Sequence, residues 1–206
     1  MASSLEEALI RLRKGEAIAF STETFFGLGA DPRSVSGVHA VCELKSRKIG
    51  YGIPLIMDSA SRLDPYLAEE SEEAKAMRLK LQKTFWPGPL TLVVAGNNRA
   101  KVEFVPEIFG ADFSFAVRVS SDAQARYLAE QLGGLISATS ANPHHAPPAR
   151  SVEEVQAYFP ELYVVPVKER ESYPEASTIV DVRTYPFTVL REGAISKLEV
   201  QAALYE

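Results

Sequence analysis

Two hydroxyl side chains precede a pair of glycines near the start of the chain, in the segment Ser-Thr-Glu-Thr-Phe-Phe-Gly-Leu-Gly at residues 21–29. A short apolar run at residues 17–20 leads into this segment and predicts a strand. Threonine hydroxyls donate and accept hydrogen bonds, and glycines let a backbone turn tightly or approach a ligand closely. The pattern predicts a ligand-binding turn after a strand, with the spacing of neither a Walker loop nor a dinucleotide fingerprint.

Cations and neutral hydrogen-bonding side chains recur at several later places where a strand or helix is expected to end. Arginine forks onto phosphate or carboxylate and lysine supplies a movable charge, so such a set favours a polyanionic ligand. Phosphoryl or adenylyl transfer needs this chemistry, because its catalysis is mainly positioning and charge neutralisation. Taken singly, each residue is equally compatible with a solvated cation or a turn. The candidates are Thr22, Thr24, Lys45, Arg47, Arg118, Ser140, Asn142 and Arg191.

Other reactive side chains form weaker patterns. Two adjacent histidines lie in a proline-rich loop at residues 143–148 without a neighbouring Cys, Asp or Glu, so no metal site is predicted there. Cys42 lies on the apolar face of an expected helix, which favours packing over a nucleophilic role. Glu23 and Asp31 could ligate Mg²⁺ or act as bases, but their spacing requires neither role.

Length and composition bound the class of protein. The chain has 206 residues, of which 46% are apolar, so we expect one domain with a substantial core over residues 1–206. The net charge of −5 disfavours sequence-independent nucleic-acid binding, while a local basic cleft is allowed. A single cysteine excludes an internal disulfide and suits a reducing compartment. Neither a leader pattern nor an apolar stretch of about 20 residues is found, so a cytoplasmic protein is expected.

Periodic apolar residues predict the elements that position these side chains. The expected helices begin at Ser4, cover 37–45, run from Ser71 to before Pro87, cover 122–132, begin at Ser151 and cover 197–204. The expected strands cover residues 17–20, 53–57, 90–95, 113–119, 135–138, 162–167, 178–182 and 187–190.

The remaining segments are expected to be loops, notably residues 97–110 and 139–142. Alternation in the strand at 113–119 places Arg118 on the face opposite the apolar side chains. Helices and strands interleave, but several strands look like hairpin neighbours. We therefore expect an α/β fold with an open, twisted, mixed parallel and antiparallel sheet flanked by helices.

Seven motifs follow one another along almost the whole chain. They are residues 21–29, Lys-Ser-Arg at 45–47, Trp-Pro-Gly-Pro-Leu-Thr at 86–91, Val-Arg-Val at 117–119, Thr-Ser-Ala-Asn at 139–142, Ser-Thr-Ile-Val-Asp at 177–181 and Leu-Arg-Glu-Gly at 190–193. This ordered series resembles that of the YrdC-like threonylcarbamoyl-adenylate synthases. One such motif is weak evidence, whereas the whole series is specific.

The resemblance implies a nucleotidyltransferase that combines L-threonine, bicarbonate or CO₂, and ATP into threonylcarbamoyl-adenylate and pyrophosphate. A separate transferase would then move the threonylcarbamoyl group to an adenosine of tRNA. The resemblance also implies the short, single-domain form of the YrdC-like fold, with a large, positively charged concave site. Mg²⁺ is expected to accompany ATP without a dedicated protein site.

The resemblance also gives the candidate side chains roles by position. Lys45 and Arg47 are expected to be catalytic, by neutralising the phosphates and the charge of the transition state. We expect Thr22 and Arg118 at the threonine end, with Arg118 forking onto the carboxylate. The expected nucleotide-binding residues are Lys45, Arg47, Ser140, Asn142 and Arg191.

The chain also departs from the family pattern. The departures are Ser21 in place of a usual proline, Phe26 in place of a usual tyrosine, Lys48 where proline is common, and His144 and His145 in place of Ser-Gly. Two alternatives therefore stay open: a double-stranded RNA-binding module of the same fold, and a paralogue with altered carbamoyl or nucleotide chemistry. The acidic net charge and the lack of clustered aromatics for base stacking count against RNA contact as the principal role.

Overall fold

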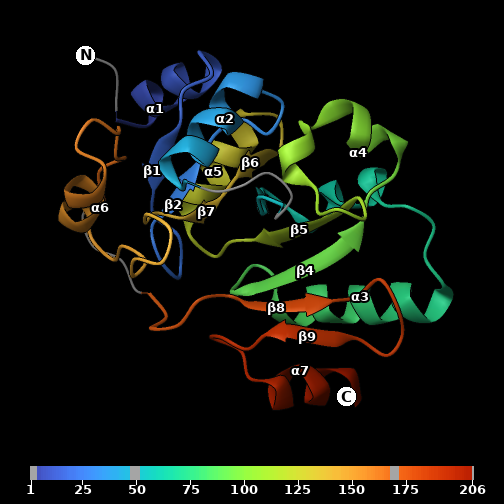
Figure 1. Ribbon diagram of the computed structural model, residues 1–206. Helices are drawn as coiled ribbons and strands as arrows, with labels where there is room; N and C mark the ends of the chain where they lie inside the picture. Colours follow the sequence, from blue (N-terminus) through green and yellow to red (C-terminus); the bar gives the residue numbers. More distant parts are fainter. Residues whose placement is uncertain (1–3, 47–51, 168–171, 206) are drawn as a thin grey trace.

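The computed structural model describes residues 4–46, 52–167 and 172–205, and it contains two β-sheets flanked by helices (Figure 1). The strands are β1 Ile18–Phe20, β2 Gly27–Gly29, β3 Leu55–Met57, β4 Leu90–Ala95, β5 Ser114–Val119, β6 Leu135–Ser137, β7 Thr139–Ser140, β8 Thr178–Asp181 and β9 Thr188–Arg191. The larger sheet has the order β6-β3-β5-β4-β8-β9, and the smaller one has the order β1-β2-β7.

The six-stranded sheet is mixed. Strand β3 pairs parallel with β5, and β4 pairs parallel with β8, whereas the other three neighbouring pairs are antiparallel. The three-stranded sheet is antiparallel throughout. The expected α/β architecture with an open mixed sheet is confirmed.

Helices cover both sheets. They are α1 Ser4–Arg13, α2 Val35–Leu44, α3 Glu72–Phe85, α4 Asn98–Glu103, α5 Ala123–Gln131, α6 Val152–Tyr158 and α7 Lys197–Tyr205. In Figure 1, α3 and α7 lie together beside β8 and β9, while α1, α2 and α6 lie around the smaller sheet. Helix α5 packs on β3 and β6 of the larger sheet. Several helices begin where the sequence predicts, because a side-chain oxygen accepts from a free backbone N–H of the first turn. These caps are Ser71 on α3, Asp122 on α5 and Ser151 on α6.

The apolar faces of these elements form two adjoining cores. The larger core joins α2, α3 and most of the large sheet, and it includes Leu81, Leu92 and Val117. The smaller core joins α1 and α5 to β1 and β6, with Leu12 and Leu128 among its members. Packing in both cores fixes the positions of the strand ends that carry the polar side chains.

Three expectations about local structure were wrong. Residues 97–110 are not loop throughout, because the Asn97 side chain accepts from the Ala100 N–H at 3.0 Å and starts the short helix α4. Thr139 and Ser140 form β7 instead of a loop, since β2 offers them a hydrogen-bonding edge. Residues 162–167 form no strand and contribute only an isolated bridge from Val164 to Ala19.

The glycines of the first motif were also misread as a turn, because they form strand β2. Their lack of a side chain serves close packing. A Cβ on Gly29 would lie 1.8 Å from the carbonyl oxygen of Ser137, and one on Gly27 would lie 3.2 Å from the ring of Phe20. The described helices include none that is long and apolar enough to span a membrane.

Candidate functional site

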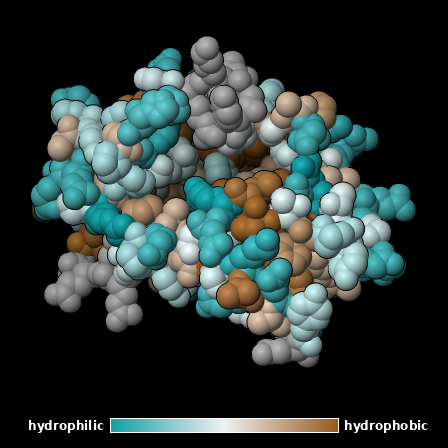
Figure 2. All heavy atoms as spheres, turned by 60° about the horizontal axis from the view of Figure 1, so that its bottom comes forward, coloured by the Kyte–Doolittle hydropathy of each residue, from teal (hydrophilic) through white to brown (hydrophobic). Residues whose placement is uncertain are grey.

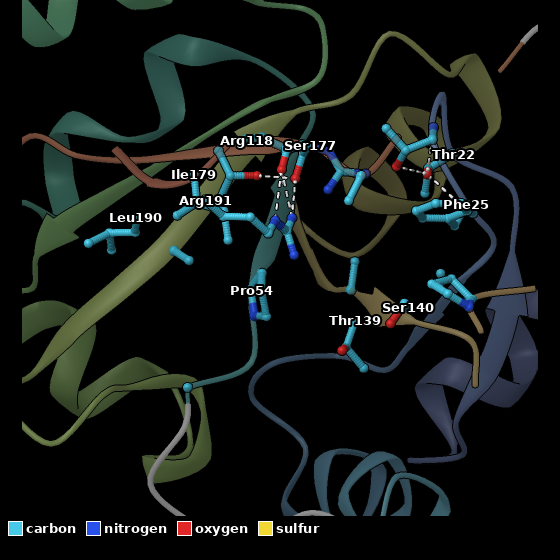
Figure 3. Close-up of a pocket in the computed structure, with 18 of the residues that line it drawn as sticks. Thr22, Phe25, Pro54, Arg118, Thr139, Ser140, Ser177, Ile179, Leu190 and Arg191 are labelled. Carbon is cyan, nitrogen blue, oxygen red and sulfur yellow. Dashed lines mark hydrogen bonds between the residues drawn. The ribbon is translucent and has the colours of Figure 1, made fainter. Parts of the chain in front are cut away.

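A cavity of about 380 Å³ is lined by strands of both sheets. Strands β4, β5, β8 and β9 line one side, while β7 and the segment after β1 line the other. Figure 2 shows a hollow near the middle of one face, with apolar and polar residues beside it. Figure 3 places Thr22 and Phe25, Arg191 and Ser177, and Thr139 and Ser140 in three groups around the cavity. The polar lining consists of Thr22, Thr24, Thr91, Arg118, Thr139, Ser140, Ser177 and Arg191.

The segment after β1 is held by its own hydroxyls. Thr22 Oγ1 donates to the carbonyl oxygen of Phe25 at 2.6 Å and accepts from the Thr24 N–H at 3.2 Å. The two threonine hydroxyl oxygens lie 3.2 Å apart, and both residues are buried. The predicted ligand-binding hydroxyls therefore line the cavity from a fixed turn.

Arg118 projects into the cavity from β5, on the face that its strand alternation predicts. Its Nε lies 3.0 Å from Glu23 Oε1 in an ion pair whose side chains are 10% and 5% exposed. The N–H is not aimed closely enough at the oxygen to form a regular hydrogen bond. Glu23 does not line the cavity. The guanidinium of Arg118 is thus anchored at one edge.

Arg191, at the end of β9, approaches the cavity near Arg118. Its Nε and Nη2 donate to the carbonyl oxygen of Ser177 at 3.1 and 2.7 Å, and Nη2 also contacts the Ser177 hydroxyl at 3.2 Å. Burial and the nearby charge of Arg118 lower the pKa of Arg191. No described lining residue is an Asp or Glu, so the two guanidinium groups make this cavity attractive to an anion.

Lys45 lies at the C-cap of α2, and it is 7% exposed. Its Nζ donates to the carbonyl oxygens of Ser140 and Asn142 at 2.8 and 2.7 Å and to Asn142 Oδ1 at 2.8 Å. The Asn142 amide in turn donates to the carbonyl oxygens of Pro143 and Ala146. Lys45 therefore holds β7 and the loop that follows it.

The structure brings into one region six of the seven residues to which the family resemblance assigns a role. Thr22, Arg118, Ser140 and Arg191 line the cavity, while Lys45 and Asn142 contact Ser140 from outside the lining. Arg47, like Lys48, lies outside the described residues.

Sequence reasoning considered Glu23 only as a metal ligand or base and did not predict its pairing with Arg118, and it missed the contributions of Thr91 and Ser177. The hydroxyls of Thr91 and Ser177 lie 2.9 Å apart and join β4 to the segment before β8. Thr91 and Ser177 belong to two of the seven motifs, which could have indicated their place at the site, but the sequence assigns neither residue a role. Cys42 packs against the larger core as expected. The described residues contain no group of three or more His, Cys, Asp or Glu side chains arranged for a metal ion.

Comparison with known proteins gives a consistent set of relatives. The family profile of the Sua5, YciO and YrdC proteins, described as "Telomere recombination", matches residues 11–193. The threonylcarbamoyl-AMP synthase of Photobacterium profundum is 34% identical over 192 residues, covering 92% of this chain and 99% of that protein. The protein of the same name from Thiobacillus denitrificans is 33% identical over 84% of this chain and 88% of the relative.

Solved structures show the same fold. Sua5 of P. abyssi, crystallised with L-threonine, superposes with a TM-score of 0.83 at 29% identity over 97% of this chain. This chain spans 57% of that longer protein. E. coli YciO superposes with a TM-score of 0.77 at 20% identity over 95% of this chain and 91% of its own.

Proposed function

The chain belongs to the Sua5/YciO/YrdC family, and we propose that it is an L-threonylcarbamoyladenylate synthase. The observation that carries the proposal is a cavity whose described lining presents two arginines and several hydroxyls without a carboxylate, in a chain alignable with nearly the whole of a threonylcarbamoyl-AMP synthase. Such a lining suits the carboxylate of an amino acid and the phosphates of ATP together.

The reaction joins three substrates. The amine of L-threonine and bicarbonate form a carbamate with loss of water, and a carbamate oxygen then attacks the α-phosphorus of ATP. The bond from that phosphorus to the bridging oxygen breaks, and pyrophosphate leaves. Because a carbamate is a weak nucleophile and both partners are anions, positioning and charge neutralisation are the main tasks of the protein.

We assign the threonine end to Thr22 and Arg118, where the guanidinium binds the carboxylate. Arg191, which lies near Arg118, and Ser140, on the opposite side of the cavity, bind the nucleotide. Lys45 contributes positive charge from behind Ser140 and fixes the position of that residue. Asn142 and Arg47 complete the nucleotide-binding set, and the role of Arg47 rests on its place in the Lys-Ser-Arg motif.

Residues 1–206 act as one catalytic domain in this proposal, in the cytoplasm and upstream of a tRNA-modifying transferase. Mg²⁺ would enter with ATP, and the described cavity lining offers the phosphates hydroxyls and guanidinium groups but offers the ion no carboxylate. When bound, the ion neutralises phosphate charge. The protein residues orient the phosphates and the carbamate.

Pyrophosphate release from ATP tests this proposal. The full chain is incubated with ATP, Mg²⁺, L-threonine and bicarbonate, and each component is omitted in turn. We expect release that requires all of them. Release without threonine, or salt-sensitive binding of double-stranded RNA with no turnover, would contradict the proposal.

A further inference from the structure

Glu23 is a buried carboxylate beside the cavity. The sequence leaves open whether it acts as a base, ligates a metal ion or does neither. Its Oε1 faces Nε of Arg118 at 3.0 Å, and its Oε2 accepts a hydrogen bond from the hydroxyl of Ser120. Both oxygens are therefore directed at the end of β5, and Glu23 is absent from the cavity lining. This orientation argues against direct contact with a substrate.

Glu23 is itself held firmly. Ser120 is fully buried, and its hydroxyl oxygen also accepts from the Asp122 N–H at 3.1 Å. The Ser21 hydroxyl donates to Asp122 Oδ2 at 2.8 Å, so the segment that carries Glu23 is tied to the start of α5. The Glu23 carbonyl oxygen accepts from the Tyr173 N–H at 2.8 Å. A carboxylate fixed in this way can fix a flexible partner.

We propose that Glu23 is a positioning residue that holds the Nε edge of Arg118, so that the rest of the guanidinium faces a ligand carboxylate in the cavity. This inference rests on the proposed function, which makes that carboxylate the one of L-threonine. Within the described part of the chain, Glu23 is the acidic residue that pairs with Arg118. An arginine side chain loses rotamer freedom when it is fixed, and a pre-formed ion pair removes that cost from ligand binding.

The sign of the effect separates positioning from simple charge balance. Glu23 is negative, so its removal makes the cavity more positive and by this term alone strengthens anion binding. Loss of orientation acts in the opposite direction. Weaker threonine binding after removal of Glu23 therefore reports the lost anchor.

Calorimetric titration of the full chain with L-threonine and with L-threoninamide, which lacks the carboxylate charge, tests the proposal. We expect Glu23→Ala to weaken threonine binding about tenfold or more and to change threoninamide binding less than about threefold. Glu23→Gln keeps an oxygen opposite Nε but loses the charge, so its threonine affinity is expected to lie between those of Glu23→Ala and the unsubstituted chain. Combining Glu23→Ala with Arg118→Ala adds nothing further, because the two residues act as a unit.

Glu107→Ala is the matched control. Glu107 is likewise buried, has His39 as its ion-pair partner at 2.9 Å and lies outside the cavity lining. The Glu107→Ala variant lacks a buried carboxylate but leaves Arg118 and its partner unchanged, so we expect threonine binding to be retained. If Glu23→Ala fails to fold, Ser120→Ala removes one contact of the carboxylate and is expected to weaken threonine binding a few-fold.

Three results would overturn the positioning role. The first is equal threonine affinity in Glu23→Ala and Glu107→Ala. The second, if Glu23→Ala is unfolded, is an unchanged threonine affinity in Ser120→Ala. The third is a loss of kcat in Glu23→Gln as large as in Glu23→Ala, which would identify Glu23 as a base. An unsubstituted chain that does not bind threonine contradicts the proposed function instead.

Discussion

Lys45 affects the cavity through its neighbours. Three oxygens of Ser140 and Asn142 accept from its ammonium group at 2.7–2.8 Å, which matches the three protons that the group carries. A lysine expected from sequence to contact phosphate thus also determines where β7 and the following loop lie. Its charge still acts on the cavity at short range.

Replacing Lys45 by methionine separates these two contributions. The variant leaves two backbone carbonyls without their donor, so we expect the free energy of unfolding to fall by about 3 kcal/mol and pyrophosphate release to be lost. Urea denaturation measures the first effect. Lys83→Met, at an exposed lysine, is the control and should change stability by less than about 0.5 kcal/mol. Full stability in Lys45→Met would contradict the structural part of this role.

Arg191 gives a prediction for the nucleotide. Its guanidinium donates to Ser177 and lines the cavity, so Arg191→Met should raise the KM for ATP about tenfold while the KM for threonine changes little. Steady-state pyrophosphate release at varied ATP and varied threonine measures both. The exposed Arg13→Met is the control. A selective rise in the threonine KM would reverse the assignment of the two ends.

At the level of strands, β2 packs closely against the end of β6. Gly29→Ala would place a Cβ 1.8 Å from the Ser137 carbonyl oxygen, whereas Gly27→Ala meets the edge of the Phe20 ring at 3.2 Å. We expect a loss of about 3 kcal/mol or more for Gly29→Ala and about 1 kcal/mol for Gly27→Ala, measured by urea denaturation. Equal losses would show that the close contact does not control the position of β2.

The end of β8 gives a pH-dependent prediction. Arg183 donates to both carboxylate oxygens of Asp181, and although burial opposes it, this pairing lowers the pKa of that carboxyl. Because the pKa is lower in the folded state, the ionised Asp181 carboxylate adds to the free energy of unfolding above about pH 4. This contribution disappears as the pH falls further. Asp181→Asn should therefore lower stability at pH 7 and have a smaller effect at pH 3. An equal loss of stability at pH 3 and pH 7 would contradict this prediction.

The sequence predicted those elements whose signals are local. Ser71 and Asp122 predict helix starts because their capping hydrogen bonds reach only into the first turn. Alternation along β5 correctly predicts the face on which Arg118 lies. Strand β7 could not be predicted, since two residues become a strand only because β2 lies beside them. The strand nature of Gly27–Gly29 likewise depends on distant packing partners.

For the molecule as a whole, the convergence of distant motifs was predictable and its details were not. Ordered motifs place Thr22, Arg118, Ser140 and Arg191 at one cavity, as the sequence suggests. The orientation of Lys45 away from the lining, and the pairing of Glu23 with Arg118, depend on contacts between residues about 95 apart in the chain. Spacing along the sequence carries no information about such contacts.

We infer that one cavity joins threonine, bicarbonate and ATP. Mass spectrometry of a reaction with carbon-13 bicarbonate tests it most directly. We expect threonylcarbamoyl-AMP that carries the label in its carbamoyl carbon, formed by the full chain and lost in Arg118→Met. Release of AMP or pyrophosphate with no labelled adduct, or an undiminished yield from Arg118→Met, would contradict it.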